Sequence, residues 1–349
     1  MVKTPVGILG ATGAVGQRFI QLLERHPWFE VAEVAASDRS AGKPYAEACT
    51  WRLPGAPPEA VARLTVGGIQ GPFRSKLLFS GLDSSVAGEA ESALAAQGHA
   101  VVSNSRNHRM DPDVPLLIPE VNPDHLDALA VQQKRTGGGY VVTNPNCSVV
   151  GLAMALAPLY QAFGIDSVAV VTLQALSGAG YPGVPSLDIA DNVIPYIGGG
   201  EEEKIETEPQ KILGAFTGGA FKPAAFPISS SVHRVAVVDG HTMAIFVKLG
   251  RRTSPAEACR VFAEFRGEPQ RRELPTAPRQ PIHVLTANDR PQPRLDRDLE
   301  GGMAVSVGRV REDRRYDLRL EALVHNTIRG AAGAAILNGE LLQARGLLP

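Results

Sequence analysis

The sequence has little of what marks secreted, membrane or nucleic-acid-binding proteins. Its 349 residues include three cysteines, Cys49, Cys147 and Cys259, too few and too scattered for a disulfide framework or a cysteine-based zinc site. No apolar run approaches the roughly 18 residues that a membrane-spanning helix needs. The formal net charge is −1, whereas nucleic acid and anionic membranes select an excess of Lys and Arg. We therefore expect small-molecule partners, no nucleic acid, no membrane and no metal.

The chain nevertheless has enough apolar sequence for a substantial core. Hydrophobic residues make up 44% and charged residues 20%, and the length allows two domains. Residues 1–5 enter a strand and a glycine-rich loop directly, which leaves no room for a signal peptide. We therefore expect a cytoplasmic location.

The first third of the chain alternates between strand and helix patterns. The predicted strands are 6–9, 31–36, 77–79, 100–103 and 140–143, and the predicted helices are about 14–25 and 83–97. This βαβ rhythm is typical of a Rossmann-type, doubly wound parallel sheet.

After residue 147 the pattern changes to that of an α+β domain with a mostly antiparallel sheet. We predict a helix at 148–163, strands at 168–173, 242–248, 301–310 and 316–324, and one helix at 326–342. That C-terminal helix is expected to return to the first domain. The predicted division is 1–146 plus 326–349 for the first domain and 147–325 for the second.

A glycine-rich turn joins the first strand to the first helix. Gly10, Gly13 and Gly16 would let the backbone approach a pyrophosphate, which the helix N-terminus then binds. The spacing is G-x-x-G-x-x-G rather than G-x-G-x-x-G, so the prediction depends on its place in the βαβ unit. The alternative is a glycine-rich turn without a ligand.

The end of the second strand bears on which dinucleotide binds. Asp38 is the type of residue that accepts the ribose 2′-OH of NAD, but Ser37, Arg39 and Ser40 beside it, with Lys43 nearby, suit a 2′-phosphate. We predict NADP; an ordinary solvated loop is the alternative for Arg39 and Lys43.

The tetrad Asn-Pro-Asn-Cys at 144–147 lies between a predicted strand and a predicted helix. Cys147 would then lie at a helix N-terminus, where free N–H groups and the helix dipole stabilise a thiolate. Such a thiolate is a candidate nucleophile, and the alternative is a small buried hydrophobic residue.

Other side chains would complete a site around such a nucleophile. His241 precedes a strand and can act as acid or base, while Arg234 can bind a carboxylate bidentately. Gln174 ends a strand and can orient a substrate, unless it is merely a polar strand end. Arg106 and Arg109 follow a parallel strand, where such sheets bind ligands. Glu201 and Lys204 lie one helical turn apart, with a solvated ion pair as the alternative.

Taken together, these residues resemble aspartate-semialdehyde dehydrogenases, most of all the branch found in archaea and fungi. The resemblance covers essentially the whole chain. The motifs that carry it are 10–16, 144–147, Gln174, Ser-Gly-Ala-Gly-Tyr-Pro-Gly at 177–183, Glu-Glu-Glu-Lys at 201–204, Arg234 with His241, and 325–333.

The resemblance implies a role for each matching position. Cys147 would form a thioacyl-enzyme, His241 would be the general acid/base, and Gln174 would position the substrate. Implied substrate contacts are Arg234 to the α-carboxylate, Glu201 to the ammonium, Lys204 and Arg109 to phosphate, with Asn146 beside them. The predicted cofactor contacts are Gly10, Thr12, Gly13, Ala14, Val15, Ser37, Arg39, Ser40, Ser177, Gly178 and Asn326, the last near the nicotinamide.

The implied reaction is the NADPH-dependent reduction of 4-phospho-L-aspartate to L-aspartate 4-semialdehyde with release of phosphate, in lysine, threonine and methionine biosynthesis. The resemblance also implies a homodimer or homotetramer formed through the second domain. One alternative is malonyl-CoA reductase, a related enzyme that binds neither an ammonium group nor inorganic phosphate; Asn146 and the Glu201/Lys204 pair favour the aspartyl substrate. The other is a non-catalytic NADP-binding redox sensor.

Overall fold

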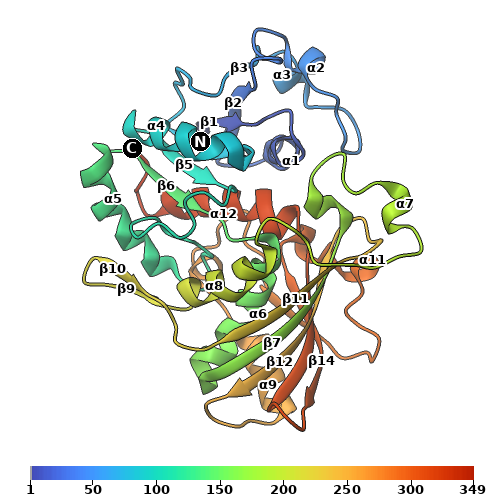
Figure 1. Ribbon diagram of the computed structural model, residues 1–349. Helices are drawn as coiled ribbons and strands as arrows, with labels where there is room; N and C mark the ends of the chain where they lie inside the picture. Colours follow the sequence, from blue (N-terminus) through green and yellow to red (C-terminus); the bar gives the residue numbers. More distant parts are fainter. Residues whose placement is uncertain (1) are drawn as a thin grey trace.

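The computed structural model describes residues 2–349, so residue 1 of the predicted first domain lies outside the described residues. A parallel sheet with its helices forms the upper half in Figure 1, and a larger sheet forms the lower half. Both chain ends lie in the upper half, and helix α12 (Gly333–Ala344), drawn in red, runs between the two sheets.

The first sheet has the strand order β3-β2-β1-β4-β5-β6, and all its pairings are parallel. Its strands are β1 (Thr4–Leu9), β2 (Phe29–Ala36), β3 (Gly67–Gly68), β4 (Leu77–Ser80), β5 (Ala100–Ser103) and β6 (Tyr140–Thr143). The helices along this part are α1 (Ala14–Leu23), α2 (Tyr45–Ala48), α3 (Glu59–Ala62), α4 (Ser84–Ala96), η1 (Pro123–Ala128) and α5 (Leu129–Thr136). The strand order reverses at β1, where doubly wound sheets bind ligands. The predicted Rossmann-type sheet is confirmed.

Burial explains why the central strands are short apolar runs. Every residue of β4, β5 and β6 is buried, as expected for parallel strands that are covered on both faces. The helix α4 begins at a capping residue, because the Asp83 carboxylate accepts the N–H of Ser85 at 2.9 Å.

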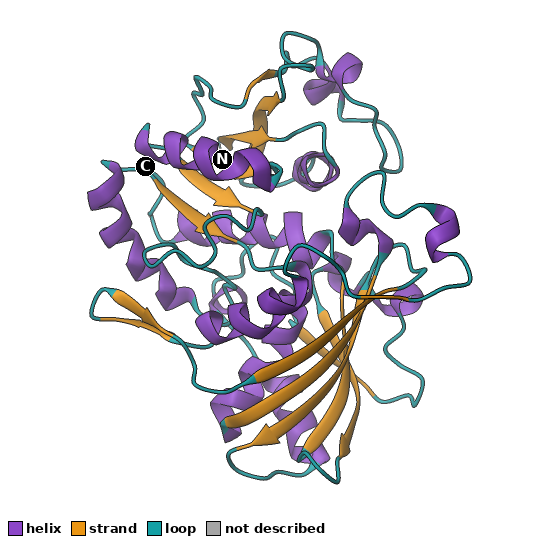
Figure 2. Ribbon diagram, viewed as in Figure 1, coloured by secondary structure: helices purple, strands orange, loops and turns teal. Residues whose placement is uncertain are grey.

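The second sheet is mixed, with the order β13-β14-β15-β12-β7-β11-β8, and its strands are strongly twisted in Figure 2. The pairs β13–β14 and β7–β11 are parallel and the others antiparallel, which confirms the predicted mostly antiparallel sheet. Its strands are β7 (Ile165–Gln174), β8 (Ile194–Pro195), β11 (Ile228–Arg234), β12 (His241–Leu249), β13 (Ile282–Leu285), β14 (Val305–Glu312) and β15 (Leu318–Val324).

Helices and a small hairpin surround this sheet. They are α6 (Cys147–Phe163), η2 (Leu176–Ala179), α7 (Ser186–Ile189), α8 (Glu201–Ile212), the hairpin β9 (Ala215–Thr217) and β10 (Ala220–Lys222), α9 (Pro255–Glu264), α10 (Glu268–Arg271), α11 (Pro293–Asp296) and η3 (Leu299–Gly302). Helix α6 packs on β12 and β15, and β12 alternates between buried and half-buried residues because one of its faces meets this helix. The apolar residues of α6, including Val150, Leu152 and Met154, belong to the core of the second domain.

Two sequence predictions about this half were wrong in detail. The strand predicted at 301–310 begins only at Val305, because Gly301 and Gly302 have φ values of +66° and +82°, which no strand accommodates. The helix predicted at 326–342 is a turn at Asn326 and Thr327, a π-helix η4 (Ile328–Ala332), and then α12.

Helix α12 returns to the first domain, as predicted. It contacts α1, β4 and β5, and Leu337, Leu341 and Leu342 are part of the apolar core that also contains Val6 and Ile8. The chain therefore completes its first domain with its last helix.

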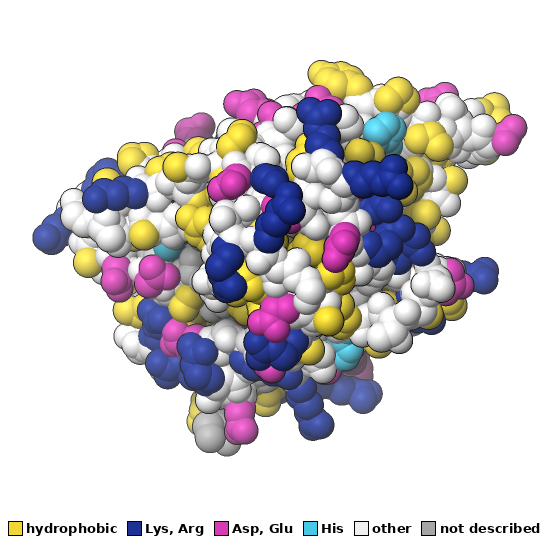
Figure 3. Space-filling view, turned by 90° about the horizontal axis from the view of Figure 1, so that it is seen from below, with side chains coloured by type: hydrophobic (Ala, Val, Ile, Leu, Met, Phe, Trp, Pro, Cys, Tyr) yellow, Lys and Arg dark blue, Asp and Glu magenta, His cyan; other side chains and the backbone are white. Residues whose placement is uncertain are grey.

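No helix in residues 2–349 is both long enough and apolar enough to cross a membrane. On the face seen from below, Lys and Arg side chains lie among Asp and Glu side chains and exposed hydrophobic ones (Figure 3).

Candidate active site

The turn between β6 and α6 presents Cys147 as the first residue of its helix. Asn146 is the N-cap, and its side-chain oxygen accepts the N–H groups of Ser148 at 2.9 Å and Val149 at 3.3 Å. This cap fixes the first turn and leaves Cys147 at the positive end of a 17-residue helix.

The first Asn of the tetrad, Asn144, anchors the same turn and was missed from the sequence. Its fully buried amide donates to the Asn104 Oδ1 at 2.8 Å and to the Ala331 carbonyl at 2.9 Å, and it accepts from Asn338. The turn is thereby joined to the end of β5 and to the C-terminal helices. The available signal in the sequence was that the tetrad contains another Asn besides Asn146.

Cys147 and His241 are in direct contact, although they are 94 residues apart. The Cys147 Sγ lies 3.1 Å from the His241 Nε2, while the His241 Nδ1 accepts the Ala175 N–H at 3.0 Å. A nitrogen that accepts a hydrogen bond carries no proton, so the neutral ring in this position has its proton on Nε2 and donates it towards sulfur.

Burial makes both members of this pair neutral. It raises the pKa of the Cys147 thiol to about 12, with a further contribution from Glu201, while Arg109 and Arg234 oppose the shift. Burial, followed by the Arg234 charge, lowers the pKa of His241 to about 3. The sequence predicted a thiolate that the helix N-terminus stabilises; burial of the thiol opposes that stabilisation by removing its hydration.

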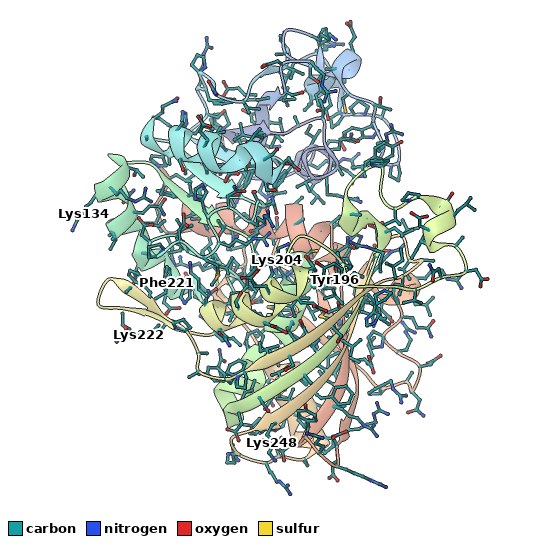
Figure 4. All side chains as sticks on the ribbon, in the orientation of Figure 1. Lys134, Tyr196, Lys204, Phe221, Lys222 and Lys248 are labelled. Atoms are coloured by element: carbon teal, nitrogen blue, oxygen red, sulfur yellow. The ribbon has the colours of Figure 1, made fainter. Side chains whose placement is uncertain are left out.

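Glu201 connects three of the predicted side chains. Its Oε1 accepts from the Asn146 Nδ2 at 2.9 Å and from the Gln174 Nε2 at 3.1 Å, and its Oε2 accepts from the Lys204 Nζ at 3.2 Å. Glu201 is only 7% exposed, so the pair with Lys204 is not the solvated ion pair that was the alternative. Figure 4 shows Lys204 in the middle of the molecule, between the two sheets.

Arg234 ends β11 directly opposite Gln174, the last residue of β7. Its Nη1 donates to the Ala175 carbonyl at 2.8 Å. A Cβ at Gly178 would lie 2.9 Å from that Nη1 and 3.0 Å from the His241 Cε1, so glycine is needed where the 177–180 loop passes the two side chains. The loop therefore packs closely against both Arg234 and His241.

Of the two candidate phosphate arginines, Arg109 is buried and Arg106 is exposed. Arg109 donates to the Glu208 carboxylate at 2.9 Å and to the Asn104 carbonyl at 2.8 Å, while its buried Nε has no hydrogen-bond partner among residues 2–349. Arg106 donates to the Gly199 carbonyl at 3.0 Å. Glu208 was missed from the sequence; its place two turns after Glu201 was the available signal.

One cavity of about 570 Å³ joins the nucleophile to the start of α1. The predicted site residues in its wall are Ala14, Val15, Arg109, Asn146, Cys147, Gln174, Ser177, Gly178, Glu201, Lys204, Arg234 and Asn326. His241 lies behind Cys147 rather than in the wall. Other predicted cofactor residues also lie outside it: Gly10, Thr12, Gly13, Ser37, Arg39 and Ser40.

The glycine loop has the close backbone packing that a dinucleotide site needs. Gly10 has a φ of +71°, and a Cβ on Gly16 would lie 2.2 Å from the Gly10 carbonyl oxygen. Gly13, the exposed N-cap of α1, provides no side-chain cap, which leaves the first N–H groups of this helix for an anion. These residues fit a pyrophosphate.

The other end of the predicted cofactor site lies on an exposed turn. The Ser40 N–H donates to the Ser37 carbonyl at 2.8 Å, and Arg39 and Lys43 are exposed. At the opposite end, Asn326 donates to the Ser177 Oγ and accepts the Gly240 N–H, both at 2.8 Å. Asn326 thereby holds the 177–180 loop against the wall of the cavity.

No group of three or more His, Cys, Asp and Glu side chains within the described range could hold a metal ion.

Comparison with known proteins shows which family has this sequence and fold. Residues 5–129 match the family model described as semialdehyde dehydrogenase, NAD binding domain, and residues 156–329 match semialdehyde dehydrogenase, dimerisation domain. An aspartate-semialdehyde dehydrogenase of Methanothermobacter thermautotrophicus is 51% identical over 97% of this chain and 98% of its own length. The chain belongs to the aspartate-semialdehyde dehydrogenase family.

Other members of this family agree over the whole chain. The aspartate-semialdehyde dehydrogenase of Schizosaccharomyces pombe is 47% identical, with 100% of both chains covered. The crystal structure of the aspartate semialdehyde dehydrogenase with NADP from Candida albicans has a TM-score of 0.92 and 43% identity, covering 99% of this chain and 100% of that one. The resemblance seen in the sequence is confirmed, for archaeal and fungal relatives alike, and the protein is an oxidoreductase.

Proposed function

We propose that the protein reduces 4-phospho-L-aspartate to L-aspartate 4-semialdehyde with NADPH, through a thioester on Cys147. The observation that carries the proposal is the continuous cavity from the start of α1 to Cys147, with Arg234, Glu201 and Arg109 in its wall. It combines a place for a dinucleotide, a nucleophile and separate charges for the ends of an amino-acid phosphate.

The residues present fit NADP. The uncapped start of α1 and the glycines at 10–16 suit the pyrophosphate, and Ser37, Arg39 and Ser40 on the exposed turn suit a 2′-phosphate. The relative of 43% identity was crystallised with NADP. When bound, NADPH supplies the hydride that reduces the acyl group, next to Ser177, Gly178 and Asn326.

His241 assists Cys147 mainly as a hydrogen-bond donor. Its Nε2–H faces the Cys147 Sγ, so it stabilises negative charge on sulfur both when sulfur attacks the acyl phosphate and when it leaves the reduced carbon. The Ala175 N–H at Nδ1 and the charge of Arg234 both disfavour a long-lived imidazolium. When sulfur attacks, the bond between the acyl carbon and the phosphate oxygen breaks, and the thiol proton passes to the departing phosphate, which leaves as HPO4²⁻ beside Arg109.

Charge complementarity selects the substrate. Arg234 binds the α-carboxylate, Glu201 the ammonium, and Arg109 with Lys204 the phosphate. Glu201 and Lys204 form an ion pair at 3.2 Å, so the zwitterionic phosphate replaces an internal ion pair rather than meeting bare buried charges. Gln174 and Asn146 hold Glu201 in place through its Oε1.

We further propose the predicted division into a dinucleotide-binding part, 1–146 with 326–349, and a catalytic part, 147–325. The second part contains a dimerisation domain; we propose a homodimer or homotetramer. We also propose a cytoplasmic location and a place in lysine, threonine and methionine biosynthesis. The three cysteines, all within residues 2–349, form no disulfide.

The direct test is oxidation of L-aspartate 4-semialdehyde, measured with NADP and with NAD, with and without inorganic phosphate. We expect sustained NADP reduction, beyond one equivalent per active site, only when phosphate is present. A parallel assay with NADPH compares 4-phospho-L-aspartate with malonyl-CoA. Robust turnover of the CoA thioester alone would favour malonyl-CoA reductase, and NADPH binding without any turnover would favour the redox sensor.

A further inference from the structure

One face of α8 carries four charged residues, three of them buried and Lys204 half-buried. Glu201, Lys204, Glu208 and Lys211 follow one another at intervals of three, four and three residues, which places them along one side of the helix. Only Glu201 and Lys204 line the cavity. Glu208 and Lys211 are 2% and 4% exposed, and the proposed reaction has not yet given them a role.

The two oxygens of Glu208 bind two different parts of the active site. Oε1 accepts from the Arg109 Nη1 at 2.9 Å, and Oε2 accepts the backbone N–H of Asn146 at 2.7 Å. Asn146 is the N-cap of the helix that begins with Cys147. A single carboxylate therefore fixes the distance between the arginine of the phosphate subsite and the start of the nucleophile's helix.

Lys211, one turn further along α8, holds the main chain of the same arginine. Its Nζ donates to the carbonyl oxygens of Arg109 at 2.8 Å, Asp111 at 2.8 Å and Val114 at 2.9 Å. Burial lowers the pKa of Lys211 to about 8. Arg109 is thus held at its guanidinium by Glu208 and at its backbone by Lys211, so α8 determines where this arginine lies.

We propose that Glu208 is a positioning residue for the phosphate subsite. It holds the Arg109 guanidinium at a fixed distance from Cys147, so that bound phosphate can attack the acyl carbon. Glu208 does not line the cavity, so it acts through Arg109 and Asn146. Attack by phosphate on the thioester requires the reacting atoms to be held within about 3–3.5 Å. This inference rests on the proposed function, because it assigns a role in that reaction.

The test separates the step that uses phosphate from the step that does not. With L-aspartate 4-semialdehyde and NADP but no phosphate, one equivalent of NADPH should form as Cys147 is acylated; added phosphate then releases the acyl group. Glu208→Gln keeps the size of the side chain but replaces one acceptor oxygen with an NH₂ group, which cannot accept from Arg109 or from the Asn146 N–H. We expect release at low phosphate to slow about 10–100-fold, the effect of losing a hydrogen bond to a charged group.

The phosphate-independent burst should keep its amplitude in Glu208→Gln, and its rate should fall much less than the rate of release, because acylation by the aldehyde uses no phosphate contact of Arg109. Glu208→Asp should recover part of the phosphate step, since it restores both the charge and the two acceptors. The matched control is Glu206→Gln on the same helix, whose carboxylate accepts the Ser230 N–H at 3.0 Å on the side of the sheet. This control should change both steps by about twofold or less.

Unchanged release by phosphate in Glu208→Gln would overturn the proposal, and so would equal losses in burst and release, which indicate a general structural role. If Glu208→Gln does not fold, Glu208→Asp measured in the same way decides: a selective loss at the phosphate step supports positioning, and no selective loss rejects it. A wild-type protein without any phosphate-dependent release would reject the proposed function itself.

Discussion

The pocket around Cys147 and the turn at residues 37–43 differ in how much of their geometry exists before any ligand binds. In the pocket, Arg109, Glu201 and Arg234 are 6–7% exposed, and each has hydrogen-bond partners within the protein. On the turn, Arg39 and Lys43 are exposed. The pocket is therefore preorganised for chemistry, whereas the turn offers hydrated charges that contribute only once a ligand covers them.

This difference predicts how each region responds to substitution. A change in the pocket removes a group with several buried partners, so it should lower kcat or abolish turnover. A change on the exposed turn removes one contact with a ligand, so it should raise the Kd of the cofactor and leave the chemistry intact.

The largest effect is expected for Cys147→Ser. Loss of the nucleophile should lower turnover on the order of 10³-fold or more while leaving the Kd for NADPH nearly unchanged. Steady-state kinetics and NADPH fluorescence titration measure the two quantities. Turnover at a tenth of the wild-type rate or higher would refute the assignment of the nucleophile.

The pH dependence of Cys147 alkylation tests whether burial or the helix N-terminus controls the thiol. Because its pKa is raised to about 12, the thiolate fraction should rise with pH throughout the range below that value. Alkylation of the ligand-free protein by iodoacetamide should accelerate roughly tenfold per pH unit between pH 7 and 9. Peptide mass spectrometry separates Cys147 from Cys49 and Cys259. A rate that is already at a plateau at pH 7 would show a resting thiolate instead.

Arg234→Lys tests carboxylate recognition within the pocket. An ammonium group cannot bind a carboxylate bidentately, and it cannot also maintain the bond to the Ala175 carbonyl. We expect kcat/KM for L-aspartate 4-semialdehyde to fall about 30-fold, with KM for NADP unchanged. A loss that falls mainly on NADP would move Arg234 to the cofactor site.

The smallest effect is expected on the exposed turn. Arg39→Ala should raise the Kd for NADPH about tenfold and change that for NADH much less, because only NADPH has a 2′-phosphate. Isothermal titration with both cofactors gives the ratio, and Lys43→Ala serves as the comparison on the same turn. Equal losses for the two cofactors would remove the 2′-phosphate role of Arg39.

The sequence was sufficient for the architecture and for most side chains around Cys147, because strand periodicity, glycine spacing and helix starts are local signals. It was not sufficient for interactions that join distant segments. The bonds from Glu208 to Arg109 and from Asn144 to Asn338 span 99 and 194 residues, and no local pattern encodes them. Burial also raises the pKa of the Cys147 thiol, and the sequence does not show how completely the second domain covers that thiol. The strand expected from residue 301 failed because Gly301 and Gly302 adopt positive φ values.

The central claim is that Cys147 becomes acylated. The most direct measurement is the mass of the protein after incubation with L-aspartate 4-semialdehyde and NADP in phosphate-free buffer. We predict an aspartyl thioester on the peptide that contains Cys147, which disappears when phosphate is added and does not form in Cys147→Ser. Phosphate-dependent turnover with no adduct on Cys147, or with an adduct on another residue, would contradict the account.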